Sequence, residues 1–184
     1  MKTRIVQILF IVLSTVFAAA CQDMWPAFGG AKPPFLLALS LHWAFIQPEV
    51  DKDDRHAEVP PFYTARWIPA AIFAGAFEDA LSGFPVGCST GYFLLAGAAA
   101  RALQRSASIL KSAVLGFIAL SLCAPLHEVW LAVWGVVGDD STLFIRFFAA
   151  VLPAAPVGAL LFLILPRIET HIGFEGTLMD GRRA

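Results

Sequence analysis

The chain has 184 residues, of which 58% are hydrophobic and 15% are charged, and its formal net charge is -1. A soluble domain is nearer half apolar and a quarter charged, so this chain has too few charges to cover a globular surface in water. The composition therefore predicts a single-domain membrane protein. The charge balance argues against a nucleic-acid partner, because such a partner needs a basic face.

The first apolar segment covers residues 4–20 and follows Lys2. We expect an uncleaved transmembrane helix, because about 17 apolar residues are enough to span a bilayer and further apolar segments follow. A cleaved signal peptide is the alternative, since Ala18-Ala19-Ala20-Cys21 resembles a lipoprotein cleavage site. In either case residue 21 emerges on the outer side.

Five further apolar segments follow, separated by residues that break helices or carry charge. We predict spans at 34–47, 66–82, 87–103, 109–135 and 143–165, joined by loops that include 21–34 and the densely charged 48–61. Pro125 breaks the fifth predicted span, and Pro166 closes the sixth before a short polar cytoplasmic tail at 167–184. The predicted fold class is all-α: a polytopic membrane bundle of about six transmembrane helices over residues 1–166.

Lysine and arginine residues predict the orientation, because cytoplasmic segments carry an excess of both. With the N-terminus inside, the outer side keeps only Lys32 and Arg146. The inner segments collect Lys2, Arg4, Lys52, Arg55, Arg66, Arg101, Arg105, Lys111, Arg167, Arg182 and Arg183. We therefore expect both termini in the cytoplasm and the turn at 82–86 on the outside.

Small residues and one acid recur through the stretch 71–97, where two apolar runs meet at a tight turn. The residues concerned are Gly75, Asp79, Ser82, Gly83, Gly87 and Gly91. Because small residues let helices approach closely in lipid, we expect these glycines to line a helix–helix seam, with Gly87 and Gly91 forming a GxxxG pattern. Asp79 either caps N–H groups at the turn or contacts a partner protein.

A second set of polar residues lies inside the apolar segments: His42, His127, Glu128 and Arg146. We expect His42 to be hydrogen-bonded to a neighbouring helix. We predict an ion pair between Glu128 and Arg146, or a polar cluster that they share, because an intramembrane carboxylate needs a partner. Such a pair either sets the register of the helices or forms a proton or substrate site.

Gly87-Cys88-Ser89-Thr90-Gly91 matches the GxSxG pattern of serine hydrolases, but no strand precedes it to form the exposed turn that this pattern needs. A hydrolase in the membrane would also need His127 at the same depth. The three cysteines lack CxxC spacing, and no HExxH, P-loop or Rossmann glycine pattern occurs. We therefore expect no catalytic, cofactor or metal site.

The pattern Gly75-x3-Asp79-x2-Ser82-Gly83-x3-Gly87 between two apolar runs resembles the central hairpin of the bacterial rod shape-determining protein MreD family. The N-terminal span, the run Pro34-Phe35-Leu36-Leu37-Ala38-Leu39 and the chain length are also similar to that family. The acidic loop at 48–61, Glu78, and the sequence Pro125-x-His127-Glu128 depart from it.

The resemblance implies a non-enzymatic, multi-pass subunit of the bacterial inner membrane in the cell-elongation machinery. Members of that family bind the bitopic partner MreC and help to couple MreB filaments to peptidoglycan synthases. The expected docking surface is the outward hairpin with its flanking helix faces.

The alternative comes from another class of protein: the substrate-binding membrane subunit of an energy-coupling-factor vitamin transporter, which is also a six-helix protein of this size. This interpretation predicts a closed polar pocket on the outer side, built on His42, Glu128 and Arg146.

Overall fold

The computed structural model describes residues 2–27, 29–45, 67–107, 111–136 and 140–171. The predicted loop at 48–61 and residues 172–184 of the predicted tail lie outside these ranges. Within them the chain is all-α, as predicted, with no strand. The helices are α1 (Lys2–Met24), α2 (Phe35–Phe45), α4 (Trp67–Ser82), α5 (Cys88–Ala107), α6 (Ser112–Val133) and α7 (Asp140–His171).

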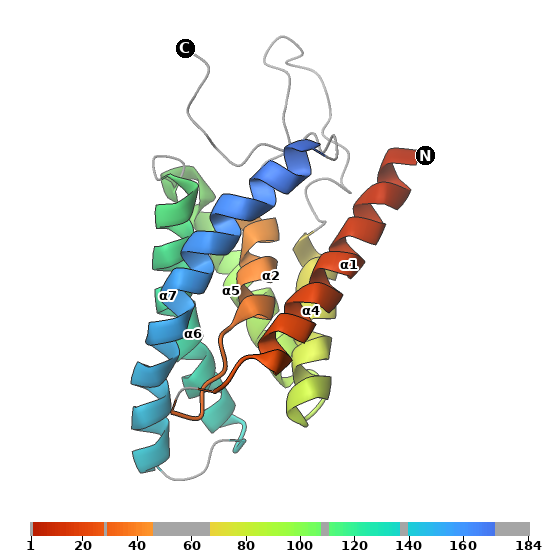
Figure 1. Ribbon diagram of the computed structural model, residues 1–184. Coiled ribbons are helices and arrows are strands. Elements are labelled where there is room, and N and C mark those ends of the chain that lie inside the picture. The colour runs from red at the N-terminus through yellow and green to blue at the C-terminus, as the bar shows by residue number, and fades with distance from the viewer. Residues whose placement is uncertain (1, 28, 46–66, 108–110, 137–139, 172–184) are drawn as a thin grey trace.

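The helices form a bundle in which consecutive elements run in opposite directions (Figure 1). One end, called here the hairpin end, carries the turn between α4 and α5, the loop from α1 to α2, and the facing ends of α6 and α7. The start of α1 and the end of α7 both lie at the opposite end. This arrangement is compatible with the predicted alternation of spans.

Two predicted helix ends and one predicted helix break are wrong. Helix α1 continues to Met24, so residues 21–24 are helical and not part of a loop. Helix α6 is continuous through Pro125, and α7 continues through Pro166 to His171. A proline removes one donor but its φ suits a helix, so packing against neighbouring helices can keep the helix intact.

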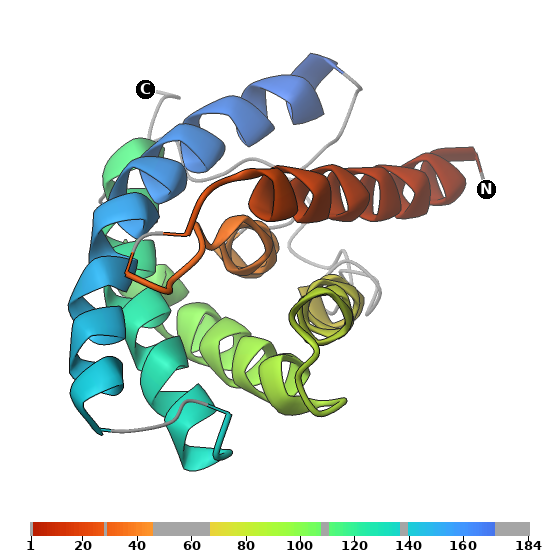
Figure 2. The same cartoon turned by 60° about the horizontal axis from the view of Figure 1, so that its bottom comes forward.

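Helix α2 occupies the centre of the bundle, with the other helices arranged around it (Figure 2). It contacts every other described helix, and all its residues from Leu36 to Phe45 are buried. Apart from Ser40 and His42 the helix is apolar, so it has no face suited to water. The shortest of the described helices therefore lies at the core of the bundle.

Helix α1 exposes several large apolar side chains, while much of its buried face is made of small and polar residues. Ile11, Thr15, Ala18, Ala19 and Gln22 are buried. They follow helical spacing and so share one face. The exposed residues include Leu9, Leu13, Val16 and Phe17. This distribution is the reverse of that in a water-soluble helix.

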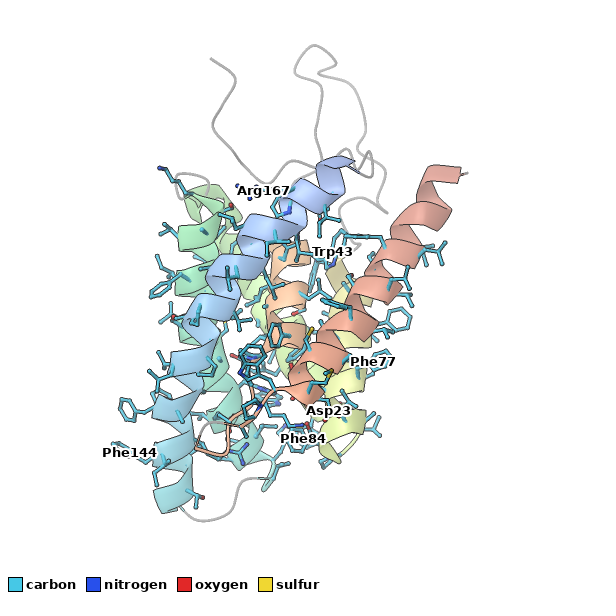
Figure 3. All side chains as sticks on the ribbon, viewed as in Figure 1. Asp23, Trp43, Phe77, Phe84, Phe144 and Arg167 are labelled. Atoms are coloured by element: carbon cyan, nitrogen blue, oxygen red, sulfur yellow. The ribbon has the colours of Figure 1, made fainter. Side chains whose placement is uncertain are left out.

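Many large apolar side chains are also exposed on α6 and α7. Figure 3 shows Phe144 projecting away from the bundle, whereas Trp43 lies between α1 and α2 with its ring centroid 6.0 Å from that of Phe10. By length and composition, two described helical segments could cross a membrane: Ser112–Val133 and Thr142–Glu169.

Helices α6 and α7 cross at two glycines that the sequence interpretation did not use. A Cβ added to Gly116 would lie 2.2 Å from the carbonyl oxygen of Gly158, and one added to Gly158 would lie 2.2 Å from that of Gly116. No side chain fits at such a distance, so the two backbones are in direct contact.

Candidate functional site

The turn between α4 and α5 is built by the residues of the predicted motif. Gly83, with φ +67°, follows the last residue of α4, and the N–H of Phe84 donates to the carbonyl of Asp79 at 3.0 Å. This is a Schellman ending, in which a left-handed residue closes the helix. Gly87, with φ +95°, then leads the chain into α5. Both positions favour glycine because other residues are strained there.

Asp79 caps the start of α5 across this turn. Its carboxylate accepts hydrogen bonds from the backbone N–H of Gly87 at 2.8 Å and of Ser89 at 2.7 Å, with the Thr90 hydroxyl at 3.4 Å. The residue is only 2% exposed. Of the two roles considered for Asp79, the cap is the one that its contacts show, because the side chain points into the hairpin.

The glycines of the motif do not form one seam. Gly75 does bring two helices together, because an added Cβ would lie 2.4 Å from the Thr90 Cα. Gly87 precedes α5 and has no neighbour within 4 Å of an added Cβ, whereas Gly91 would meet only the Trp130 ring at 3.5 Å. The predicted GxxxG contact is therefore wrong: Gly87 serves the turn and Gly91 makes an ordinary contact.

Glu78, the neighbour of Asp79, faces a different part of the molecule. Its carboxylate accepts hydrogen bonds from the side-chain amide of Gln22 in α1 and, at 3.4 Å, from the Ser82 hydroxyl. The amide oxygen of Gln22 accepts the backbone N–H of Leu36 at 3.1 Å. Gln22 and Glu78 thus join the end of α1, the start of α2 and the end of α4.

The ion pair expected between Glu128 and Arg146 is present. The Nε of Arg146 in α7 donates to the Oε2 of Glu128 in α6 at 2.8 Å. Gly30, with φ +85°, lies against the stem of the Arg146 side chain, where an added Cβ would be 3.6 Å from Cγ. The loop before α2 therefore covers the ion pair at the hairpin end.

His127 lies beside this pair, against aromatic rings of α5. Its ring centroid is 4.9 Å from that of Tyr92 and 5.6 Å from that of Phe93. The Tyr92 hydroxyl donates to the carbonyl of Cys123 in α6, which ties the two helices together here. Nε2 of His127 has no hydrogen-bond partner among the described residues.

These polar groups line one cavity at the hairpin end. Its volume is about 320 Å³, at the lower end of the range for small-molecule sites. The polar lining residues are Gln22, Lys32, Glu78, Ser82, His127, Glu128 and Arg146, and the apolar ones include Leu37, Phe84, Phe93 and Leu131. In Figure 3 the labelled Asp23 and Phe84 mark this end of the bundle.

His42 does not belong to this cluster, so the predicted grouping of four residues is wrong. Its Nε2 lies 2.9 Å from Oε1 of Glu169, near the end of α7 and toward the opposite end of the bundle. Both residues are fully buried. The expected hydrogen bond from His42 to a neighbouring helix is confirmed, and its partner is an acid that the sequence interpretation had assigned to the tail.

The GxSxG segment shows no serine–histidine pair in the described part of the chain. The backbone N–H of Ser89 donates to Asp79, while its buried Oγ has no hydrogen-bond partner there. Within the described ranges, no group of three or more His, Cys, Asp and Glu side chains is placed to hold a metal ion.

The sequence interpretation missed Gln22 and Lys32 as cavity residues and noted Glu78 only as a departure from the family pattern. The adjacent acids Glu78 and Asp79 could have indicated a second polar partner. Neighbouring residues on a helix point about 100° apart, so Glu78 is expected to face a different part of the molecule from Asp79. Gln22 offered none, since an amide at a helix end is ordinary.

Comparison with protein-family models, curated proteins and solved structures gives no match in any of the three.

Proposed function

We propose that this chain is a non-enzymatic, multi-pass protein of the bacterial inner membrane that docks an MreC-like partner in the cell-elongation machinery. One observation carries the proposal: the residues that resemble the MreD hairpin act together as one structural unit. Asp79 caps α5, Gly83 and Gly87 form the turn, and Gly75 lets α4 approach α5. A chance match of small residues would not be expected to have such interdependent roles.

The distribution of side chains supports the membrane location. Buried positions include Glu78, Asp79, Glu128 and Glu169, whereas large apolar side chains are exposed along α1, α6 and α7. A soluble monomer rarely exposes an apolar surface of this extent, because water would drive its association. A bilayer provides the apolar solvent that such a surface needs.

The tip of the hairpin offers the docking surface. Val86 is 94% exposed and Pro85 is also exposed, at a turn that Asp79 and the two glycines hold in one conformation. A rigid turn loses little conformational entropy on binding, so contacts made there are not offset by the cost of ordering.

The test is co-purification in detergent with an MreC-like protein from the same genome. Substitution of Asp79 or Gly83 would disturb the turn itself, so the informative variant is Val86→Asp, which changes the exposed tip alone. We expect its recovery with the partner to fall at least about tenfold, as at a buried interface position. Val133→Asp is the matched control, because Val133 is a 78% exposed valine at the same end of the molecule. Equal recovery of the two variants would remove the hairpin tip from the interface.

A vitamin-transporter subunit is the second candidate, favoured by the polar cavity at the predicted outer end. The cavity contains Glu128 and Arg146 but not His42, so it matches that prediction in part. Gene neighbours separate the two candidates. MreB- and MreC-like genes favour the elongation machinery, whereas a transporter ATPase and vitamin genes favour uptake.

A further inference from the structure

The cavity at the hairpin end contains a buried acid whose hydrogen-bond donors are uncharged. Glu78 is 8% exposed, and its hydrogen-bond donors, Gln22 and Ser82, are uncharged. Lys32 also lines the cavity and attracts Glu78 electrostatically, but among the described residues its ion pair is with Asp23, at 3.0 Å. Burying an unpaired carboxylate is costly, so a cationic group placed in the cavity would stabilise it.

Arg146 and His127 line the same cavity. Arg146 uses Nε for Glu128, and its terminal nitrogens have no acceptor within the described residues. A guanidinium group matches the geometry of a carboxylate or phosphate through two parallel N–H groups. His127 lines the same cavity, is 8% exposed, and leaves Nε2 without a partner in the described part of the chain.

We propose that this cavity binds a small zwitterion, a molecule that carries a primary ammonium group and a phosphate or carboxylate group. The ammonium lies at Glu78 and the anionic group at Arg146, with His127 beside them. The cavity of about 320 Å³ could hold roughly ten water molecules at about 30 Å³ each, which is enough for ethanolamine phosphate. Binding of this ligand goes beyond the docking role, which rests on the exposed hairpin tip.

Two sources could supply this chemistry. One is a free zwitterion that enters from the outer side. The other is the headgroup of phosphatidylethanolamine, because the hairpin end is predicted to lie at the outer membrane–water boundary, where lipid headgroups are abundant.

The first experiment is a calorimetric titration of the purified full chain in detergent with ethanolamine phosphate. We expect one site, and at least about tenfold weaker binding of choline phosphate, because its trimethylammonium group cannot donate the charged hydrogen bond to Glu78. No binding of ethanolamine phosphate, or equal affinity for the two ligands, would overturn the proposal. This comparison uses the wild-type chain, so it stands even if a variant fails to fold.

Glu78→Gln tests the residue itself. We expect its affinity for ethanolamine phosphate to fall at least about tenfold, since the amide keeps the shape but removes the charge. Glu169→Gln is the matched control: it is the same substitution at a buried acid outside the cavity. The same affinity in both variants would mean that Glu78 is a neutral structural group, and would overturn the proposal.

The source is decided by mass spectrometry of the intact protein released from vesicles containing either phosphatidylethanolamine or phosphatidylcholine. Retention of one phosphatidylethanolamine by the wild type but not by Glu78→Gln supports the headgroup. Soluble binding without lipid retention supports a free zwitterion. If the wild type neither binds ethanolamine phosphate nor retains phosphatidylethanolamine, the inference is overturned, and the Val86 docking test is unaffected.

Discussion

Glu78 and Asp79 are neighbours in the chain but serve different partners. The helix turns by about 100° between them, so Asp79 faces the start of α5 while Glu78 faces α1 and the cavity. Asp79 accepts hydrogen bonds from two backbone N–H groups, whereas Glu78 accepts them from the neutral side chains of Gln22 and Ser82. Adjacent residues of the same chemistry therefore support a structural role in one case and a binding role in the other.

The cap formed by Asp79 has a measurable consequence. Asp79→Ala leaves the N–H groups of Gly87 and Ser89 without their acceptor, so we expect the free energy of unfolding in detergent to fall by about 2 kcal/mol. Asp23→Ala removes an acid from an exposed ion pair and should cost about 0–1 kcal/mol. Equal losses in the two variants would show that the cap contributes little.

At the level of helices, the bundle is organised around α2 and around one close crossing. Helix α2 contacts each of the other described helices, and α6 and α7 meet through Gly116 and Gly158. Because dispersion forces depend on close contact, two backbones without side chains between them form an extended and specific contact in lipid.

Replacing glycine with alanine should change the stability of the protein in opposite directions at Gly116, which lies at the crossing, and at Gly91, which does not. Gly116→Ala places a Cβ 2.2 Å from a carbonyl oxygen and should destabilise the protein by about 1–3 kcal/mol or more. Gly91→Ala meets only the Trp130 ring at 3.5 Å and should be neutral or stabilising by up to about 1 kcal/mol, because alanine favours helix. Thermal unfolding of both variants in detergent checks this. A destabilised Gly91→Ala beside an unchanged Gly116→Ala would contradict the crossing.

For the whole molecule, the proposed multi-pass arrangement needs an exposed apolar surface and helices of alternating direction, and two described helical segments could cross a membrane by length and composition. Helix α2 is the shortest of the described helices: its 11 residues rise only about 16 Å, well short of a hydrocarbon core of about 30 Å. Since α2 is enclosed by protein, its ends need not reach the membrane surface to find polar partners.

Orientation can be tested with single cysteines in a chain whose Cys21, Cys88 and Cys123 are replaced. We expect a membrane-impermeant maleimide to label Val86→Cys in intact cells, because this exposed residue lies at the hairpin end. Leu103→Cys, also exposed but near the opposite end of α5, should react only after the inner membrane is permeabilised. The reverse pattern would invert the topology predicted from the lysine and arginine residues.

Much of the helical framework was predictable from the sequence. The length of an apolar run and the positions of proline and glycine influence where a helix begins and ends through nearby residues alone. The Glu128–Arg146 pair was also predictable, since two lone charges in neighbouring apolar segments need each other. The continuation of helices through Pro125 and Pro166 was not, because packing against other helices outweighs the local cost of a proline.

The sequence alone established an all-helical, predominantly apolar chain with a tight hairpin, since these properties depend on residues close together in the chain. Packing alone placed Glu78 beside Gln22, and His42 beside Glu169, residues 56 and 127 positions apart. It also placed α2, the shortest of the described helices, at the core. Such contacts depend on how distant segments meet in space, and the hydrophobic pattern of a single segment carries no information about its distant partners.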